Sequence, residues 1–267
     1  MKVQNKVIVV TGGGNGIGRE LVLQLLDKGA SVAAVDINDA ALKETSALAG
    51  TNQVRLSNHW VNVTDRAIVD TLPDQVIVRH GAVDGIINNA GIIQPFVRIH
   101  DLAYDAIERV MKVNFYGTLY MVKAFLPHLL KRPKAHIANL SSIGGFLPVP
   151  GQTVYGASKA AVKLLTEGLY SELMNTNVRV TLIYAGAVRT NITINSGLSV
   201  APQSEGSSSF RMLSAHEAAR QIIAAIEQDR YNALVGSDAR LIDLLYRFNP
   251  KWATELIYEK MKSLLPS

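Results

Sequence analysis

The sequence predicts a single α/β domain built on a doubly wound, Rossmann-type parallel sheet with helices on both faces. Three observations support this fold class. Short β-branched runs alternate with stretches of helical periodicity, and such alternation is typical of a parallel sheet. A glycine cluster at residues 12–18 separates the first apolar run from the first helical stretch. The 267 residues are 48% hydrophobic and 18% charged, as expected for one large packed core.

The first half of the sheet follows from apolar runs and the residues that end them. Val7–Val10 predicts a buried strand, and Arg19–Lys28, after the glycines, has leucines at helical spacing. Gly29 is expected to end that helix. A second strand and a second helix are expected at Ser31–Val35 and Asp39–Ala49, which completes a βαβα unit.

The same alternation continues to the end of the chain. Further strands are expected at Val54–Leu56, Val83–Ile87, His136–Leu140, Val178–Ile183 and Ala233–Val235, and further helices at Arg66–His80, Tyr104–Leu130, Tyr155–Met174 and Ala215–Gln228. We assign residues 1–240 to one dinucleotide-binding and catalytic domain, with a serine- and glycine-rich lid at 190–213. Residues 241–267 predict a helical tail, interrupted at Pro250, that packs on the same domain or on a neighbouring subunit.

Charge and residue usage argue against several classes of function. The net charge of +5 comes from 27 basic and 22 acidic residues that are scattered, so nucleic acid is not an expected partner. The chain has no cysteine, which excludes thiolate chemistry and fits a cytoplasmic location. None of the six histidines has metal-binding spacing, so no metal is expected. No apolar stretch is long enough for stable membrane insertion.

The glycine cluster has the position and composition of a phosphate-binding turn. Glycine permits a tight turn, lets backbone N–H groups approach a pyrophosphate, and leads into a helix whose positive end favours an anion. Asp36 closes the second strand, where a carboxylate accepts hydrogen bonds from ribose hydroxyls and repels a 2′-phosphate. Neither Asn15 nor Ile37 supplies a positive charge for that phosphate, so NAD(H) is the expected cofactor. A role for Asp36 as a turn residue or helix cap is the alternative.

Several motifs in a fixed order resemble the short-chain dehydrogenase/reductase family over residues 6–236. They are Gly12, Gly16 and Gly18, the segment Asn88-Asn-Ala-Gly91, Asn114 in Val-Asn-Phe-Tyr-Gly, the pair Ser141-Ser142, and Tyr155-Gly-Ala-Ser-Lys159. The resemblance implies hydride transfer between a nicotinamide and an alcohol or ketone, and assembly as a homodimer or homotetramer. Ala185 stands where the family commonly has proline, so a softer loop is expected there.

The glycine loop, Asp36 and the family resemblance together define a candidate cofactor site. Its residues are Gly12, Asn15, Gly16, Ile17, Gly18, Asp36, Ile37, Asn62, Val63, Asn88, Ala90, Gly91, Tyr155, Lys159, Gly186, Val188 and Thr190. By the resemblance, Val188 and Thr190 would hold the nicotinamide carboxamide.

The candidate catalytic residues centre on Tyr155. Lys159 lies four residues later on a predicted helix, so both side chains share a face. A nearby ammonium would lower the phenol pKa from its ordinary value of about 10, as general acid or base catalysis requires. The resemblance implies that Lys159 also binds the ribose, that Ser142 holds the substrate oxygen, and that Asn114 supports a proton relay through water. Ser141 competes with Ser142, and the 13-residue spacing to Tyr155 favours Ser142.

The residues expected around the substrate are mostly apolar. They are Ile92, Ile93, Gln94, Phe96, Gly144, Phe146, Pro148, Val149, Tyr184 and Ala187. Arg98 and Arg189 lie nearby in the sequence, but neither has a defined direction toward a carboxylate or phosphate. We therefore predict a lipophilic secondary alcohol or ketone as substrate. Two alternatives remain: a 3-oxoacyl-thioester reductase and a non-catalytic dinucleotide-binding regulator.

Overall fold

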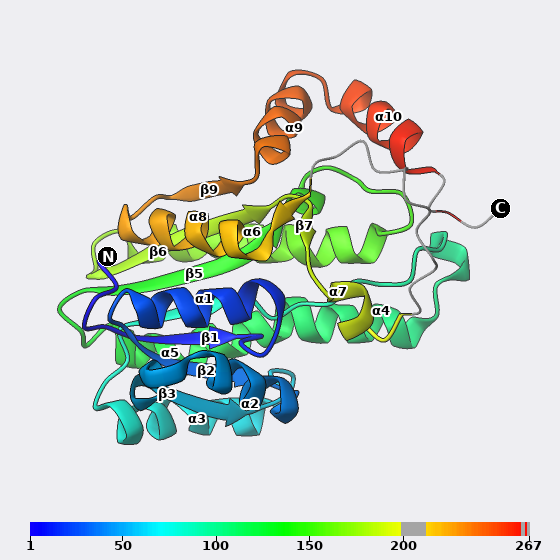
Figure 1. Ribbon diagram of the computed structural model, residues 1–267. Helices are drawn as coiled ribbons and strands as arrows, with labels where there is room; N and C mark the ends of the chain where they lie inside the picture. The colour runs from blue at the N-terminus through cyan, green and yellow to red at the C-terminus, as the bar shows by residue number, and fades with distance from the viewer. Residues whose placement is uncertain (199–211, 263–264, 266–267) are drawn as a thin grey trace.

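The computed structural model describes residues 1–198, 212–262 and 265, and its main sheet is parallel (Figure 1). Seven strands follow the order β3-β2-β1-β4-β5-β6-β9. Their bounds are β1 (Val7–Thr11), β2 (Ser31–Asp36), β3 (Leu56–Trp60), β4 (Gly85–Asn88), β5 (Ala135–Ser142), β6 (Val178–Ala185) and β9 (Asn232–Val235). The predicted doubly wound fold is confirmed, and the order reverses between β1 and β4.

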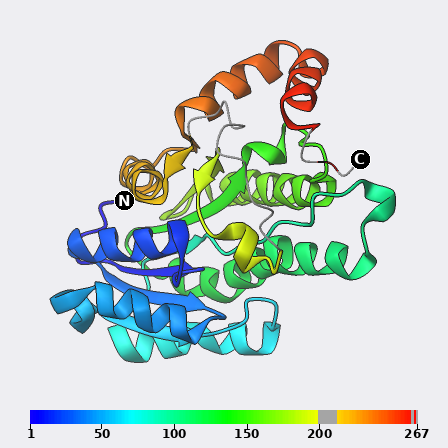
Figure 2. The same cartoon turned by 45° about the vertical axis from the view of Figure 1, so that its right-hand side comes forward.

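Helices cover both faces of the sheet (Figure 2). The helices α1 (Gly16–Asp27), α2 (Asp39–Leu48) and α8 (Ala215–Glu227) lie on one face, and α3 (Arg66–His80), α5 (Thr118–Leu129) and α6 (Thr153–Leu173) lie on the other. Leu25 of α1 and Ile222 of α8 share one fully buried cluster, while Leu72 of α3 and Phe125 of α5 share the second. Apolar side chains at helical spacing therefore fix each helix to the sheet.

The third strand is the element that the sequence placed wrongly. A strand was expected at Val54–Leu56, but residues Gly50–Arg55 form a 3₁₀ helix and β3 begins at Leu56. This strand lies at the edge of the sheet, and of its five residues only Leu56 is buried. Because an edge strand need not bury both faces, it carries no continuous apolar run for a sequence search to find.

The long helix expected from residue 104 to residue 130 is divided in three. It consists of α4 (Tyr104–Met111), a π-helical turn at Lys112–Gly117, and α5. Single π-helical turns are frequent at functional sites, and this one carries the buried Asn114. A Cβ added at Gly117 would lie 2.8 Å from a Val63 methyl group, so this glycine allows the turn to approach the loop after β3.

The predicted lid has short regular segments at both ends. Just before the lid, β7 (Val188–Arg189) pairs with β8 (Leu213–Ser214), which begins at the last residue of the lid, and α7 (Ile192–Asn195) lies in its described part. Residues 199–211 of the lid lie outside the described residues. Short 3₁₀ turns also occur at Ile99–Asp101 and Ile143–Gly145.

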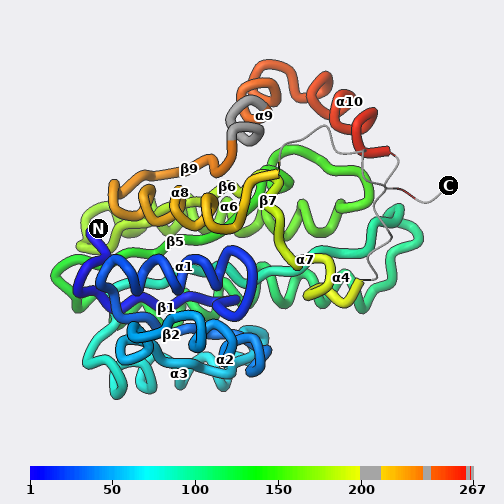
Figure 3. The backbone as a smooth tube through the Cα atoms, viewed as in Figure 1, coloured from blue at the N-terminus to red at the C-terminus, as the bar shows by residue number. Residues whose placement is uncertain are grey.

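The tail forms two helices that pack on their own chain (Figure 3). These are α9 (Ser237–Phe248) and α10 (Pro250–Met261), so the break falls at Pro250 as expected. Ile242, Ala253 and Ile257 form a small buried cluster with Leu147, which follows β5 and its 3₁₀ turn. No helix in the described part of the chain is both long and apolar enough to cross a membrane.

Candidate active site

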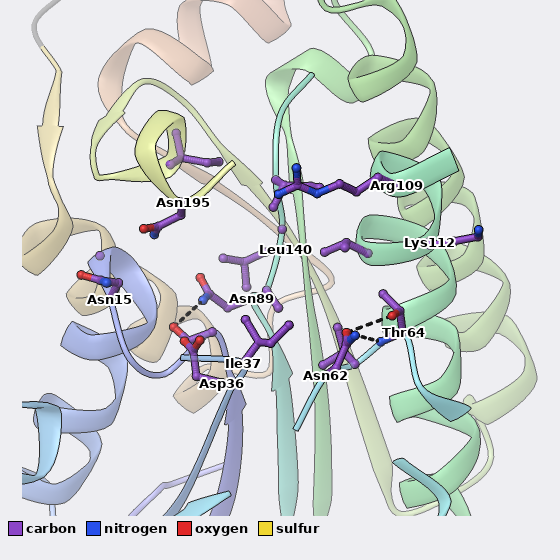
Figure 4. A pocket seen from close by; sticks show the side chains of 18 of the residues that line it. Asn15, Asp36, Ile37, Asn62, Thr64, Asn89, Arg109, Lys112, Leu140 and Asn195 are labelled. Atoms are coloured by element: carbon purple, nitrogen blue, oxygen red, sulfur yellow. Dashed lines mark hydrogen bonds between the residues drawn. The ribbon is translucent and has the colours of Figure 1, made fainter. Parts of the chain in front are cut away.

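A cavity of about 580 Å³ opens where the central strands end, next to the reversal between β1 and β4 (Figure 4). Ligands of open α/β sheets bind at this position. The structure places most of the predicted cofactor residues around it, namely Gly12, Asn15, Gly16, Ile17, Asp36, Ile37, Asn62, Val63, Ala90, Gly91, Tyr155, Lys159 and Thr190. The separate motifs therefore converge on one site.

Four predicted cofactor residues do not line this cavity. Gly18 packs beneath the loop, where an added Cβ would lie 1.9 Å from the carbonyl oxygen of Gly12. Gly186 donates its N–H to the Val235 carbonyl, and Val188 packs against the core. Gly18 thus shapes the loop, while the cofactor contacts expected of Gly186 and Val188 stay predictions.

Asn88 is the fourth, and its neighbour Asn89 takes its place at the cavity. The Asn88 side chain is buried and donates to Oδ1 of Asn139 at 2.8 Å, within the sheet. Asn89 lines the cavity and donates from Nδ2 to the Thr11 carbonyl at 2.9 Å. Successive side chains at a strand end face opposite ways, and that alternation was the available signal for Asn89.

Asp36 lies in the cavity wall and also holds two backbone turns. Its Oδ2 accepts the N–H of Gly14 at 2.9 Å, and its Oδ1 accepts that of Asn38 at 2.9 Å. Arg19, in the first turn of α1, forms a bidentate ion pair with the carboxylate of Glu44. In this geometry Asp36 can stabilise the turns and still face a ribose in the cavity, so the two interpretations of this residue are compatible.

The phenol of Tyr155 has a partner other than the one expected. Burial raises its pKa above the ordinary value, and a hydrogen bond with Ser142 opposes that rise. Lys159 is not among the groups that shift this pKa, and its Nζ donates to the Leu140 carbonyl at 2.9 Å. The structure therefore does not show the expected lowering of the phenol pKa by Lys159.

The two neighbouring serines have different partners. The Ser141 hydroxyl is buried and donates to the backbone carbonyl of Lys159 at 2.8 Å, which ties β5 to α6. The Ser142 hydroxyl accepts the N–H of Gly144 at 3.1 Å and bonds with Tyr155. This geometry favours Ser142 as the residue beside the phenol, in agreement with the spacing argument.

Asn114 connects three parts of the site through its side chain. Its Oδ1 accepts the N–H of Ile92 at 2.9 Å, and its Nδ2 donates to the Ile92 carbonyl at 3.0 Å and to the Ser158 hydroxyl at 2.9 Å. A Cβ added at Gly91 would lie 3.2 Å from Nζ of Lys159 and 3.3 Å from Oδ1 of Asn114. The side chain of Asn114 thus holds the loop after β4 against α6.

Gln94 was predicted to line the substrate pocket, and the structure corrects this. The side chain is fully buried, and its Oε1 accepts the N–H groups of Val154 at 2.8 Å and Tyr155 at 3.0 Å. Its Nε2 donates to the Gly151 carbonyl at 2.9 Å. These N–H groups belong to the first turn of α6 and have no partner within that helix, so Gln94 positions the helix that carries Tyr155.

The other predicted substrate residues are not gathered around the described cavity. Of the set, only Ile92 lines it, whereas Ile93, Phe96, Gly144, Phe146, Pro148, Val149, Tyr184 and Ala187 do not. Gly144 lies beside the phenol, since its added Cβ would be 3.4 Å from the Tyr155 ring. The Phe146 ring packs 5.3 Å from Tyr184 and 5.7 Å from Tyr246, centre to centre, and so links β6 to the tail.

Removing the buried ammonium of Lys159 is expected to stabilise the fold at neutral pH. Burial lowers the pKa of Lys159 from 10.5 to about 8. Where the amine is charged in both the folded and the unfolded protein, this shift reduces the free energy of unfolding by an amount on the order of 3 kcal/mol. Between pH 8 and 10.5 the folded protein loses this proton before the unfolded chain does, so the cost declines as pH rises. Lys159→Met should therefore have a higher free energy of unfolding than the wild type at pH 7. At pH 10 the difference between the two proteins should be smaller. Urea denaturation at both pH values measures this, and a difference independent of pH would contradict it.

Among the residues that the structure describes, no group of His, Asp and Glu side chains is arranged to hold a metal ion.

Comparison with known proteins places this geometry among known dehydrogenases. The family model described as short chain dehydrogenase matches residues 6–199. SadH of Mycobacterium tuberculosis is 33% identical over 251 residues, covering 91% of each chain. The 3-oxoacyl-(acyl-carrier-protein) reductase FabG of Thermotoga maritima is 34% identical over 199 residues, covering 72% of this chain and 78% of FabG.

Solved structures of similar proteins superpose on nearly the whole length of this chain. A short-chain dehydrogenase/reductase from Burkholderia phymatum, in complex with NAD, has a TM-score of 0.84 and 25% identity, covering 94% of this chain and 96% of its own. A short-chain dehydrogenase from Burkholderia cenocepacia, in complex with NADP, has a TM-score of 0.81 and 26% identity, covering 96% and 99%.

Proposed function

The chain belongs to the short-chain dehydrogenase family, and on that premise we propose that it transfers hydride between NAD(H) and a lipophilic secondary alcohol or ketone. The observation that carries the proposal is the hydrogen-bonded pair of Tyr155 and Ser142, next to a cavity that begins at the glycine loop. A phenol that lines this cavity can exchange a proton with a substrate oxygen bound there.

In the proposed mechanism the nicotinamide, when bound, supplies or accepts the hydride. Tyr155 takes the hydroxyl proton during oxidation and returns it during reduction. Ser142 donates a hydrogen bond to the substrate oxygen, and this donor acts selectively because negative charge on that oxygen is larger in the transition state. Apolar lining residues such as Ile92 would exclude water once substrate is bound, which would strengthen these interactions.

Lys159 and Asn114 have supporting roles in this proposal. With a pKa of about 8, Lys159 is charged at neutral pH. Its ammonium would hold the ribose of a bound cofactor and favour the phenolate if it exchanged the Leu140 carbonyl for these partners. The side-chain amide of Asn114 is occupied by Ile92 and Ser158. Its backbone carbonyl accepts the Thr118 hydroxyl at 2.9 Å, and we propose that the second lone pair of this carbonyl holds a relay water.

The direct test is a screen of alcohols and ketones in which turnover is followed by nicotinamide absorbance. Oxidation of lipophilic secondary alcohols with NAD, and reduction of the matching ketones with NADH, is the expected result. Turnover restricted to charged sugars or to acyl-thioesters would contradict the substrate proposal.

Asp36 is expected to make the protein prefer NADH over NADPH. Its carboxylate lines the cavity at the end of β2, where a 2′-phosphate would be repelled. Titration by nicotinamide fluorescence should show NADH binding at least ~10-fold tighter, with Asp36→Asn reducing that ratio by about 10-fold. Asp39→Asn is the matched control, since Asp39 pairs with Lys43 on the exposed side of α2. Equal affinities in the wild type would reverse the assignment to NAD.

Similarity to FabG favours a 3-oxoacyl-thioester reductase as the second candidate. That activity would use the same proton donor on a thioester-linked ketone, and it shows itself as turnover of a 3-oxoacyl-thioester in the same screen. A non-catalytic regulator would instead bind dinucleotide without any turnover.

Assembly and location stay predictions. A homodimer or homotetramer is supported by the exposed side chains of Leu164 on α6 and Tyr116 on the π-helical turn, both large and apolar. The cytoplasm remains the proposed compartment on the basis of the cysteine-free composition.

A further inference from the structure

Arg109 reaches from α4 into the cavity at a place that the sequence did not predict. Figure 4 shows its side chain directed into the pocket. Lys112, on the π-helical turn after α4, also contributes to the cavity wall, but its side chain extends away from the opening. The guanidinium lies beside Gly197, just after α7, because a Cβ added there would be 3.6 Å from Nη1 of Arg109. Arg109 therefore reaches from α4 to the described start of the lid.

The guanidinium of Arg109 carries a positive charge without a partner in the described part of the chain. Lys112, which lies nearby, pairs with Glu108 at 2.8 Å, and Lys159 donates to a backbone carbonyl. Asp105 lines the same cavity one turn before Arg109, but the two form no ion pair among the described residues. An exposed cation that faces a ligand cavity is available to an anionic group of that ligand.

The glycine loop offers no cation of its own. Residues 12–18 contain neither lysine nor arginine. Arg19, which donates to the Gly14 carbonyl at 2.9 Å, is already paired with Glu44, so the loop would meet a pyrophosphate through backbone N–H groups and the start of α1. Figure 4 also shows Asn195 of α7 beside the same opening. A negative charge in the middle of the cavity would thus face the backbone N–H dipoles of the glycine loop and α1 on one side. On the other side it would face Arg109 of α4.

We propose that Arg109 is the counter-ion of the cofactor pyrophosphate and closes over it from the side opposite the glycine loop. This inference rests on the proposed binding of a dinucleotide. A planar guanidinium suits two phosphate oxygens, and its contact with the residues after α7 means that a bound pyrophosphate would also draw α4 and α7 together.

The test compares ADP with adenosine by calorimetry on the full-length protein. Arg109→Met should weaken ADP binding by about 10-fold and leave adenosine affinity unchanged, since only ADP carries the phosphate charges. Lys123→Met is the matched control, because it removes the same charge from an exposed residue of α5 that does not line the cavity. It should alter ADP affinity by less than ~2-fold, and the Arg109 effect should shrink as salt rises.

Three results would overturn the assignment, and they differ from one another. An equal loss for ADP and adenosine would mean that Arg109 shapes the cavity without binding phosphate. Unchanged ADP affinity, with a raised KM for a carboxylate-bearing ketone, would make Arg109 a substrate contact. A wild-type protein that binds neither ADP nor NADH would reject the dinucleotide site itself, and with it the proposed function.

Discussion

Turnover of Tyr155→Phe is expected to fall by about 10²–10⁴-fold, the usual contribution of a positioned proton donor and acceptor. The phenol hydroxyl is the group that exchanges a proton with the substrate, and a phenylalanine ring fills the same space beside Gly144. Affinity for NADH should stay within about 2-fold, because the substitution removes no charge and no backbone contact. Steady-state kinetics and nicotinamide fluorescence measure the two quantities separately.

The matched control is Tyr170→Phe, on the same helix. Tyr170 is partly exposed and packs against Tyr231, far along α6 from the first turn. Loss of its hydroxyl should leave turnover unchanged. Near-normal turnover in Tyr155→Phe would refute the mechanism, whereas undetectable turnover in both the wild type and the variant, with normal NADH binding, would support a regulator.

Gly18→Ala is expected to remove dinucleotide binding and to destabilise the protein by about 3 kcal/mol or more. The added Cβ would lie 1.9 Å from the carbonyl oxygen of Gly12, a backbone atom that the loop keeps in place. Relief requires that α1 or the glycine loop move, and either movement displaces the N–H groups that face the cavity. Calorimetry with NADH and urea denaturation test the two parts of this expectation.

Gly168→Ala is the control for the effect of a methyl group on a glycine. Gly168 is an exposed residue of α6, and an added Cβ there meets no atom within 4 Å. Alanine in a helix interior is favoured over glycine by roughly 0.5–1 kcal/mol, so this variant should be slightly more stable and bind NADH normally. Normal NADH binding by Gly18→Ala would show that the loop adapts to the extra methyl group.

The fold was predictable because its central strands are buried on both faces. Runs such as Val7–Val10 have no other stable environment, and the helices between them carry one apolar face. The edge strand β3 was misplaced for the converse reason: Ser57, Asn58 and His59 are polar, and backbone pairing with β2 sets its position. Backbone pairing of this kind does not produce a recognisable hydrophobic pattern in the sequence of the strand itself.

The site was predictable where short motifs carry the chemistry and unpredictable where distant segments meet. Gln94 meets the first turn of α6 about sixty residues later, and only the folded chain shows that its amide holds backbone N–H groups. The direction of Lys159 toward Leu140 likewise depends on how α6 packs on β5. Arg109 was overlooked because α4 offers several exposed charges, and the sequence does not tell which of them points inward.

The small cluster formed by Leu147, Ile242, Ala253 and Ile257 stands apart from the two clusters that hold the sheet. The matched family model also ends before the tail begins. Substitutions in α9 and α10 should therefore alter the surroundings of Phe146 while leaving the sheet and the residues around Tyr155 in place.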